Sequence, residues 1–227
     1  MPLKSAGSRR STVAAHVQRT IFLEKSALQA YTSRVGPRPA VFMDRDGTLT
    51  EEVGYVNHPK RLRVQPRSAE AIRRLNEAGI AAVVVTNQAG IARGYFSEEV
   101  LAAVNAALVS RLKDEGAHLD GIYVCSHHPT EGEPPYRMVC ECRKPKPGLL
   151  LRAASELGLD LSGSTLVGDK ASDLATARAV GARSVLVLTG YGLGEWEYRR
   201  DAFAVPPDHV AEDLLDAVDW VIGSRRS

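Results

Sequence analysis

Short apolar runs alternate with longer amphipathic segments along most of the chain. The apolar runs have the length of buried strands, and we predict strands at 40–43, 80–85, 121–124, 165–167 and 184–188. Each predicted helix between them is followed by a glycine, where helices commonly stop. These helices span 68–78, 97–115, 148–157 and 172–180. A short strand near 209–211 and a closing helix around 214–222 complete the pattern.

Strands that are separated by helices are typical of an α/β fold. We expect a Rossmann-like three-layer sandwich, in which helices cover both faces of a mainly parallel sheet. Between Asp46 and Thr86 the chain has room for little more than one helix and one strand. Between Thr86 and Lys144 it has room for a helix, a strand and a loop. We therefore expect no separate cap domain, and short loops should form the walls of any pocket.

The first 36 residues differ in composition from the rest. They contain one acidic residue, Glu24, and six basic residues: Lys4, Arg9, Arg10, Arg19, Lys25 and Arg34. Such a leader is typical of a transit peptide or an anion-binding arm, but we interpret it as a poorly ordered extension or an over-long gene start. Residues 36–39, Gly-Pro-Arg-Pro, read as a linker. We thus expect a basic N-terminal extension at 1–36 and the main domain at 37–227.

Composition and charge argue against several classes of protein. The formal net charge of +2 gives no general reason to expect a nucleic-acid partner. The longest apolar runs are too short to span a bilayer, and no hydrophobic signal region follows Met1. We therefore expect a cytoplasmic protein without membrane contact. Three cysteines, an odd number, argue against a disulfide framework.

The strongest candidate chemistry directly follows the first predicted strand. Asp44 and Asp46 flank Arg45, and Gly47 and Thr48 come next. Two carboxylates held this close repel one another unless a cation is present, and oxygen ligands favour Mg²⁺. A carboxylate at a strand end, a glycine that permits close approach and a hydroxyl together indicate a phosphoryl-transfer site. The alternative is an acidic Asp-Gly turn without catalytic function.

Other polar residues follow the remaining strands. In open α/β sheets, ligands bind beyond the carboxyl ends of the strands, where this chain has Asp44, Thr86, Cys125 and Asp169. The hydroxyl of Thr86 and the backbone N–H groups after it could hold phosphate oxygens. Asp173 lies one helical turn beyond Asp169. It either orients a lysine or supports the metal, or it is a first-turn acid favoured by the helix dipole.

A basic segment precedes the predicted helix at 148–157. Arg143 and Lys144 supply positive charge of the kind that phosphoryl transfer requires. Pro145 and Pro147 restrict the backbone of this segment. That restriction favours a fixed lysine over a solvated basic turn.

All three cysteines and a histidine fall in two short clusters, Cys125-x-His127 and Cys140-x-Cys142. Three thiolates and one imidazole suit tetrahedral Zn²⁺, and a filled shell leaves no open position for catalysis. We therefore predict a structural zinc ion that pins the loop between the two clusters. His128 is the competing fourth ligand, but the matching spacing of the two clusters favours His127.

Together these motifs resemble the haloacid dehalogenase superfamily of aspartate-nucleophile phosphatases. The resemblance is strongest to its zinc-loop branch, which contains heptose-1,7-bisphosphate phosphatases and histidinol-phosphatase domains. The matching segments are FMDRDGTL (42–49), GYVN (54–57), VVVTNQAGIARGYF (83–96), DGIYVCSHHP (120–129), CECRKPKPG (140–148) and VGDKASD (167–173). Ser126 replaces proline in the family's Cys-Pro-His-His, at a non-ligand position. The segments 1–36 and 191–207 fall outside the resemblance.

The resemblance implies a mechanism and a set of site residues. Asp44 would attack phosphorus to form an aspartyl-phosphate, and Asp46 would act as general acid and then base. Mg²⁺ would bind the Asp44 carboxylate, the Asp46 backbone carbonyl and Asp169. Thr86 and Lys144 would stabilise the phosphoryl group. The implied substrate-contacting residues are Arg45, Glu52, Val53, Gly54, Tyr55, Asn87, Gln88, Ala89, Arg93, Arg143 and Lys170.

From the resemblance we expect a monomeric enzyme that removes the C7 phosphate of D-glycero-D-manno-heptose 1,7-bisphosphate, in nucleotide-heptose and surface-glycan synthesis. The other phosphate of this substrate needs a second anion site, for which Lys60, Arg61, Arg93 and Lys146 are candidates. Hydrolysis of histidinol phosphate or of another small phosphomonoester is the first alternative. A nucleic-acid end-processing or binding protein and a catalytically silent zinc-loop module are two others.

Overall fold

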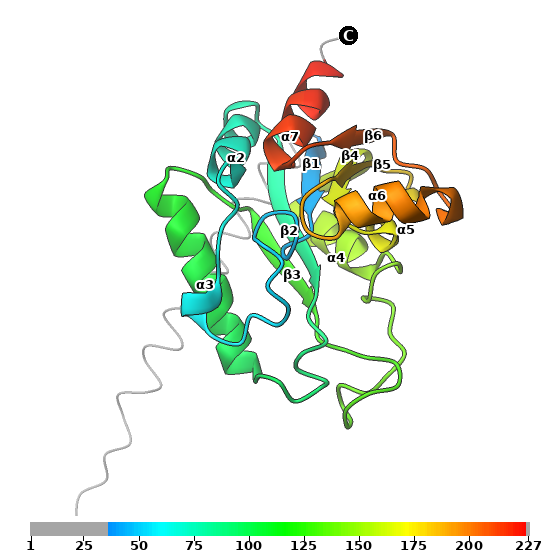
Figure 1. Ribbon diagram of the computed structural model, residues 1–227. Coiled ribbons are helices and arrows are strands. Elements are labelled where there is room, and N and C mark those ends of the chain that lie inside the picture. Colours follow the sequence, from blue (N-terminus) through cyan, green and yellow to red (C-terminus); the bar gives the residue numbers. More distant parts are fainter. Residues whose placement is uncertain (1–35, 226–227) are drawn as a thin grey trace, which may run out of the picture. The chain divides into compact units, whose positions relative to one another are not determined.

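The computed structural model describes residues 36–225, and a six-stranded sheet lies at its centre (Figure 1). Its strands are β1 (Arg38–Met43), β2 (Ala81–Asn87), β3 (Gly121–Cys125), β4 (Leu159–Gly168), β5 (Arg183–Val187) and β6 (His209–Ala211). They stand in the order β3-β2-β1-β4-β5-β6, and every neighbouring pair is parallel. The mainly parallel sheet that the sequence predicts is therefore confirmed.

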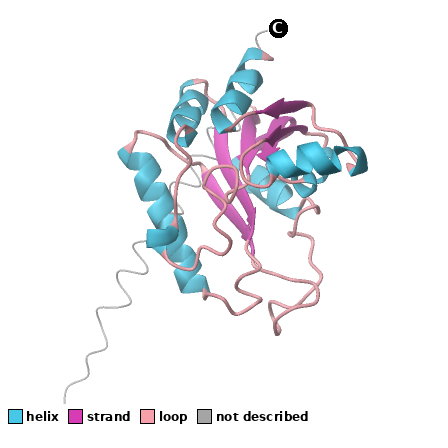
Figure 2. Ribbon diagram, in the orientation of Figure 1, coloured by secondary structure: helices cyan, strands magenta, loops and turns pink. Residues whose placement is uncertain are grey.

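Helices cover both faces of this sheet and complete the three layers (Figure 2). On one face lie α2 (Ser68–Glu77), α3 (Glu98–Asp114) and α7 (Leu214–Gly223). On the other face lie α4 (Gly148–Leu157) and α5 (Ala171–Arg178). The described chain also contains α6 (Gly192–Arg199), which follows β5, and two short 3-10 helices, η1 (Pro59–Arg61) and η2 (Arg200–Ala202).

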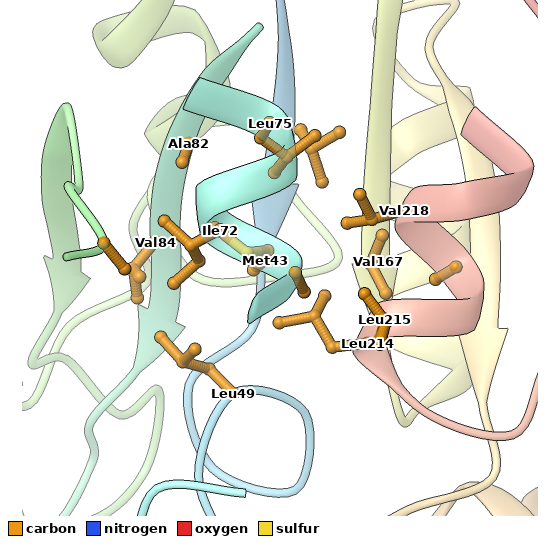
Figure 3. Close-up of a cluster of buried hydrophobic side chains, with 14 of the residues drawn as sticks. Met43, Leu49, Ile72, Leu75, Ala82, Val84, Val167, Leu214, Leu215 and Val218 are labelled. Atoms are coloured by element: carbon orange, nitrogen blue, oxygen red, sulfur yellow. The ribbon is translucent and has the colours of Figure 1, made fainter. Parts of the chain in front are cut away.

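The side chains of the central strand alternate between two buried clusters, one on each face of the sheet. Val41 and Met43 belong to the cluster under α2, α3 and α7, whereas Ala40 and Phe42 belong to the cluster under α4 and α5. Successive side chains of a strand point to opposite faces, so a strand that is buried on both faces needs a continuous apolar run. Figure 3 shows the first cluster, in which side chains of α2 and α7 meet those of the sheet.

Local sequence signals account for the ends of several helices. The Ser97 side chain accepts a hydrogen bond from the backbone N–H of Val100 at the start of α3. The Asp213 carboxylate accepts two backbone N–H groups at the start of α7. α4 ends at Gly158, whose φ of 65° lies in the left-handed region that glycine adopts most readily. These caps satisfy backbone groups that a helix end leaves without a partner.

Strands β1 and β4 begin earlier than the sequence predicts. Arg38 and Pro39 pair with Leu159 and Asp160, so this half of the predicted linker at 36–39 belongs to the sheet. The pairing register then shifts before the rest of the two strands align. Polar residues within 160–164 interrupt the apolar pattern of β4, which is why only its buried end, 165–167, was predicted.

Helix α6 is absent from the sequence prediction. It contains Gly192 and Gly194, and glycine is a poor helix former. Gly192 is its only buried residue, so the segment lacks the apolar stripe by which an amphipathic helix is recognised. The short helix is instead held by its contacts at the carboxyl edge of the sheet, which are described below.

The connections between strands are short. Within residues 36–225, η1 and α2 lie between β1 and β2, and α3 lies between β2 and β3. A loop and α4 lead from β3 to β4, and this connection passes from one side of β1 to the other. The described chain thus contains no inserted cap domain, as predicted.

The N-terminal segment was predicted to be a separate extension. Apart from Gly36, residues 1–36 lie outside the described part of the chain, so the division into 1–36 and 37–227 stays a prediction. Over residues 36–225, no helix is both long enough and apolar enough to cross a bilayer.

A core substitution should measure the contribution of packing between α2 and the sheet. Leu75 is fully buried in the first cluster, and Leu75→Ala should lower the free energy of unfolding by about 3 kcal/mol because it leaves a cavity. Leu151 on α4 is half exposed, and Leu151→Ala should cost less than about 1 kcal/mol. Urea denaturation followed by circular dichroism measures both losses, and equal losses would contradict this account of the core.

Candidate active site

The candidate site lies where the chain order of the strands reverses, at the carboxyl ends of β1 and β4. Connections run outward from β1 towards β3 on one side and from β4 towards β6 on the other, which makes this edge a topological switch point. Asp44 directly follows β1, and its backbone N–H donates to the carbonyl of Val167 at 3.0 Å. Asp169 directly follows β4. Strand pairing therefore brings these two carboxylates together.

Three buried aspartates gather at this edge. Asp44, Asp169 and Asp173 each offer a carboxylate oxygen, and the three oxygens lie within 4.8 Å of one another. Burial raises the pKa of Asp169 to about 6; the ammonium of Lys170 opposes this shift and the charge of Asp44 adds to it. Buried carboxylates of like charge need a cation, and the oxygen donors fit a hard divalent ion.

Lys144 balances part of this charge. It is almost completely buried, and its Nζ lies 3.1 Å from Asp44 Oδ1 and 2.5 Å from Asp173 Oδ1. Burial alone would lower the pKa of Lys144, but the carboxylates of Asp173 and Asp44 outweigh that effect and raise it. Lys144 is therefore a charged bridge between two aspartates. Of the readings left open for Asp173, the structure favours the one in which it orients a lysine.

Asp46 belongs to a different polar cluster on the cavity side of the turn. Its carboxylate accepts two hydrogen bonds from the guanidinium of Arg45, at 3.0 and 2.8 Å. Gln88 Nε2 donates to Asp46 Oδ2 at 2.8 Å and also contacts Thr86 Oγ1 at 3.0 Å. Gln88 thus links the loop after β2 to the loop after β1. The predicted role of the Asp46 backbone carbonyl as a metal ligand stays a prediction.

The turn after β1 depends on glycine at a close contact. Gly47 has a φ of 90°, and a Cβ atom there would lie 2.1 Å from Asp169 Oδ2. A Cβ atom on Gly190, beyond β5, would lie 2.4 Å from the same oxygen. The Thr189 hydroxyl donates to the carbonyl of Gly47 at 2.6 Å, and the Tyr191 N–H donates to Asp169 Oδ2 at 3.0 Å. The segment after β5 therefore packs directly on the aspartate cluster.

A cavity of about 440 Å³ opens above these side chains. Its lining residues are Asp44, Asp46, Glu52, Gly54, Tyr55, Thr86, Asn87, Gln88, Ala89, Arg93, Arg143, Lys144, Lys170, Ser172 and Tyr191. All but two of these were expected at the site from the sequence. The cavity size is ordinary for a small-molecule site.

Two residues predicted to contact the substrate lie outside the cavity lining. The Arg45 side chain is fully buried, and its guanidinium is bound by Asp46 and by Asn105 at 3.0 Å, so it is held away from the cavity lining. The Val53 side chain packs against the first core cluster, and its carbonyl accepts from Arg61 at 3.2 Å. Both residues support the site from behind.

Two lining residues, Ser172 and Tyr191, were missed. Ser172 lies inside the VGDKASD motif, where only the aspartates and the lysine were assigned chemistry. Tyr191 follows β5, and the rule that ligands bind beyond strand ends was applied only to the first four strands. Extending the same rule to the fifth strand would have pointed to 188–191.

A second cluster of metal-ligand type lies at the base of the loop between β3 and α4. The sulfur atoms of Cys125, Cys140 and Cys142 lie 3.0 to 3.6 Å apart, and His127 Nδ1 lies 3.3 Å from Cys142 Sγ. A tetrahedral site with Zn–S bonds of about 2.3 Å has edges of about 3.8 Å, slightly longer than these separations, and three sulfur donors with one imidazole nitrogen are a donor set that zinc prefers. His128 points elsewhere: its Nδ1 accepts from the backbone N–H of Glu131 at 3.0 Å.

The cysteine cluster is connected to the aspartate cluster through the backbone. Lys144 lies two residues beyond Cys142, and the side-chain amide of Asn87 exchanges hydrogen bonds with its backbone N–H and carbonyl, at 3.1 and 3.2 Å. Arg143 Nη1 donates to the carbonyl of His127 at 3.2 Å. The loop that carries the cysteines therefore fixes the approach of Arg143 and Lys144 to the cavity.

Comparison with known proteins agrees with this architecture. A family model described as HAD-hydrolase-like matches residues 141–217. The D-glycero-D-manno-heptose-1,7-bisphosphate 7-phosphatase of Thermosynechococcus vestitus is 42% identical over 194 residues, covering 82% of this chain and 96% of that protein. The corresponding D-glycero-beta-D-manno-heptose enzyme of Pasteurella multocida is 45% identical over 189 residues, covering 83% of this chain and 99% of that protein.

A solved structure shows the same similarity. The D,D-heptose 1,7-bisphosphate phosphatase from B. bronchiseptica, complexed with magnesium and phosphate, matches with a TM-score of 0.72 at 32% identity, covering 82% of this chain and 99% of that one. The parallel sheet and the carboxylates at its edge are those of a haloacid dehalogenase-like hydrolase. Within that class, the chain belongs to the family of D-glycero-D-manno-heptose-1,7-bisphosphate 7-phosphatases.

Divalent-cation binding at the aspartate cluster should weaken in acid. A metal ligand must be deprotonated, and the pKa of Asp169 is raised to about 6. The apparent affinity for Mg²⁺ should therefore fall about tenfold between pH 7 and pH 5. Titration calorimetry with Mg²⁺ at both pH values measures this change. An affinity that stays constant over this range would contradict the assignment, and Asp169→Asn should abolish most of the binding.

Loss of the cysteine cluster should impair the aspartate cluster as well. Cys140→Ser removes one of four zinc donors, so metal analysis should find less than one zinc per chain. The value of kcat/KM should fall at least tenfold, because the segment that carries Lys144 is no longer pinned. Ser126→Ala, at a non-ligand position between Cys125 and His127, should keep both zinc and activity. A Cys140→Ser protein with full zinc content or full activity would contradict this coupling.

Proposed function

We propose that this protein removes the C7 phosphate of D-glycero-D-manno-heptose 1,7-bisphosphate through an aspartyl-phosphate intermediate. One observation carries the proposal: a buried aspartate, Asp44, stands beside a buried lysine, Lys144, at the floor of a cavity lined by Asp46 and Thr86. The names of the relatives, which cover over four fifths of this chain, support this choice of substrate.

In the proposed first step the Asp44 carboxylate attacks phosphorus while the bond from phosphorus to the sugar oxygen breaks. Lys144 keeps its positive charge in this buried position, so it can offset the charge on the phosphoryl oxygens. The Thr86 hydroxyl lines the same cavity and can donate a hydrogen bond to them. Because Lys144 is also paired with Asp173, it is held in place before the substrate arrives.

Asp46 is the proposed general acid and base. In the first step it gives a proton to the leaving sugar oxygen, and in the second it takes a proton from the water that attacks the aspartyl-phosphate. Inorganic phosphate then leaves and Asp44 is restored. The hydrogen bonds from Arg45 and Gln88 fix the position of the Asp46 carboxylate at the cavity lining.

Mg²⁺ is the cofactor that we propose for the aspartate cluster. Asp44 and Asp169 would hold it with the backbone carbonyl of Asp46, and Asp173 supports the cluster through Lys144. When bound, the ion supplies positive charge to the phosphoryl oxygens and neutralises the neighbouring carboxylates. The magnesium and phosphate bound by the B. bronchiseptica enzyme support this assignment.

A bisphosphate also needs positive charge away from the reacting phosphorus. Of the four candidates from the sequence, only Arg93 lines the cavity. Lys146 is paired with Glu141 at 2.6 Å, and Arg61 is bound to backbone carbonyls of the loop after β1. Arg93, Arg143 and Lys170 bring positive charge to the cavity wall, although Arg93 is also paired with Glu131 at 2.9 Å and Glu52 lies in the same lining. That charge favours a second phosphate over the cationic amine of histidinol phosphate.

A substrate panel tests the proposal. Purified protein with Mg²⁺ should show a kcat/KM for the heptose bisphosphate at least tenfold higher than for histidinol phosphate. Only the bisphosphate has a second phosphate that can pair with the basic residues of the wall while the reacting phosphate lies beside Lys144. Phosphate release measured on each substrate gives the two values. A preference for histidinol phosphate would overturn the choice of substrate while leaving the phosphatase assignment intact. Cytoplasmic location and the monomeric state stay predictions.

Substitution of the proposed nucleophile separates an enzyme from a silent module. Asp44→Asn keeps the shape of the side chain but removes the attacking charge, so kcat should fall at least about 10⁴-fold. Asp114→Asn, at the exposed end of α3, should leave kcat unchanged. Circular dichroism and thermal unfolding should show that both variants keep the fold. Retained turnover in Asp44→Asn would contradict the covalent mechanism.

A further inference from the structure

The segment between β5 and α6 forms one wall of the cavity, although it lies outside the motifs by which the family is recognised. Its backbone is fixed by contacts to both aspartate loops: Thr189 holds Gly47, and the Tyr191 N–H holds Asp169. Glu195 on α6 accepts a hydrogen bond from the backbone N–H of Ala171, at the start of α5. The wall therefore has a defined position relative to the reacting groups.

Tyr191, whose backbone is fixed in this way, forms part of the cavity wall. Its ring is half exposed, and the Lys170 ammonium lies 4.4 Å from the ring centroid, within the range of a cation–π contact. The Lys170 ammonium also donates to both carboxylate oxygens of Asp169, at 3.3 and 3.4 Å, and lies 3.7 Å from Glu52. The ring is thus one of three groups that hold this ammonium at the cavity.

The position of the ring suits recognition of the part of a substrate that does not react. Asp44 and Lys144 occupy the floor, where the reacting phosphate belongs, whereas Tyr191 and Lys170 stand on the wall. A sugar presents hydroxyl groups at its edges and apolar C–H groups on its faces. An aromatic face beside an ammonium matches that combination, because the ring contacts the C–H groups and the ammonium pairs with oxygens.

We propose that Tyr191 is a specificity-determining residue, which packs against the non-reacting part of a phosphorylated sugar and positions Lys170 towards it. This inference rests on the proposed phosphatase function. It does not require that the sugar is a heptose. We expect the ring to contact the sugar equally in the ground state and in the transition state, so that its loss raises KM and leaves kcat unchanged.

Three substitutions test the role of the Tyr191 ring, the role of its hydroxyl group and its effect on Lys170. Tyr191→Leu removes the ring but keeps much of the volume, and it should raise KM for the heptose bisphosphate about fivefold, with kcat within about twofold of wild type. Tyr191→Phe keeps the ring and should behave like wild type. In Lys170→Met the further change Tyr191→Leu should raise KM less than it does in the wild type, because the part of its effect that acts through the ammonium is already gone while the contact of the ring with the sugar remains.

Tyr198→Leu is the matched control, because Tyr198 lies on α6, the helix that Tyr191 precedes, and is 83% exposed; it should leave both constants unchanged. The ratio of kcat/KM for the sugar bisphosphate to that for p-nitrophenyl phosphate, which lacks the sugar, should fall in Tyr191→Leu. An unchanged KM, or an equal loss on both substrates, would overturn the inference. If the wild-type enzyme prefers another sugar phosphate, the proposed substrate is wrong, and the same ratio measured with the preferred sugar decides the role of Tyr191.

Discussion

The mutual repulsion of Asp44, Asp169 and Asp173 is the constraint on which the site depends. Three buried carboxylates whose oxygens lie within 4.8 Å of one another would not stay ionised without opposing charge. Lys144 supplies one positive charge between Asp44 and Asp173, and Lys170 supplies another beside Asp169. The negative charge that the two lysines leave unbalanced favours the binding of a divalent cation. In the proposed mechanism, this combined positive charge keeps Asp44 ionised, so that it can act as a nucleophile.

The sheet supplies the stiffness that keeps such a cluster together. Both faces of β1 are buried under helices, so packing opposes any displacement of the strand by the repulsion between the carboxylates at its end. β4 lies next to β1 and delivers Asp169 at the same level. Lys144 comes from a loop, not from a strand, and it is placed by Asn87 and by the cysteine cluster. Strands β1 and β4 therefore place Asp44 and Asp169, while a pinned loop places the lysine that balances their charge.

Much of this arrangement could be predicted because it depends on local pattern. A strand followed by Asp44 or Asp169 is visible in the sequence, and parallel pairing then brings the two acids to one edge. Arg45 shows the limit: it lies between two site residues, yet its side chain is buried behind Asp46, and only packing decides that. Tyr191 was missed because it follows the fifth strand, beyond the four strand ends from which the site was predicted, and a long-range contact from its N–H to Asp169 holds it there.

The backbone contact between Gly47 and Gly190 has a consequence for how such enzymes can diversify. With no side chain between them, the loops after the first and fifth strands meet almost Cα to Cα beside Asp169. The point at which the later loop leaves the sheet is thereby fixed. The side chain of Tyr191, by contrast, is half exposed, so that selection for a new sugar can act on this wall while the phosphate chemistry is inherited intact.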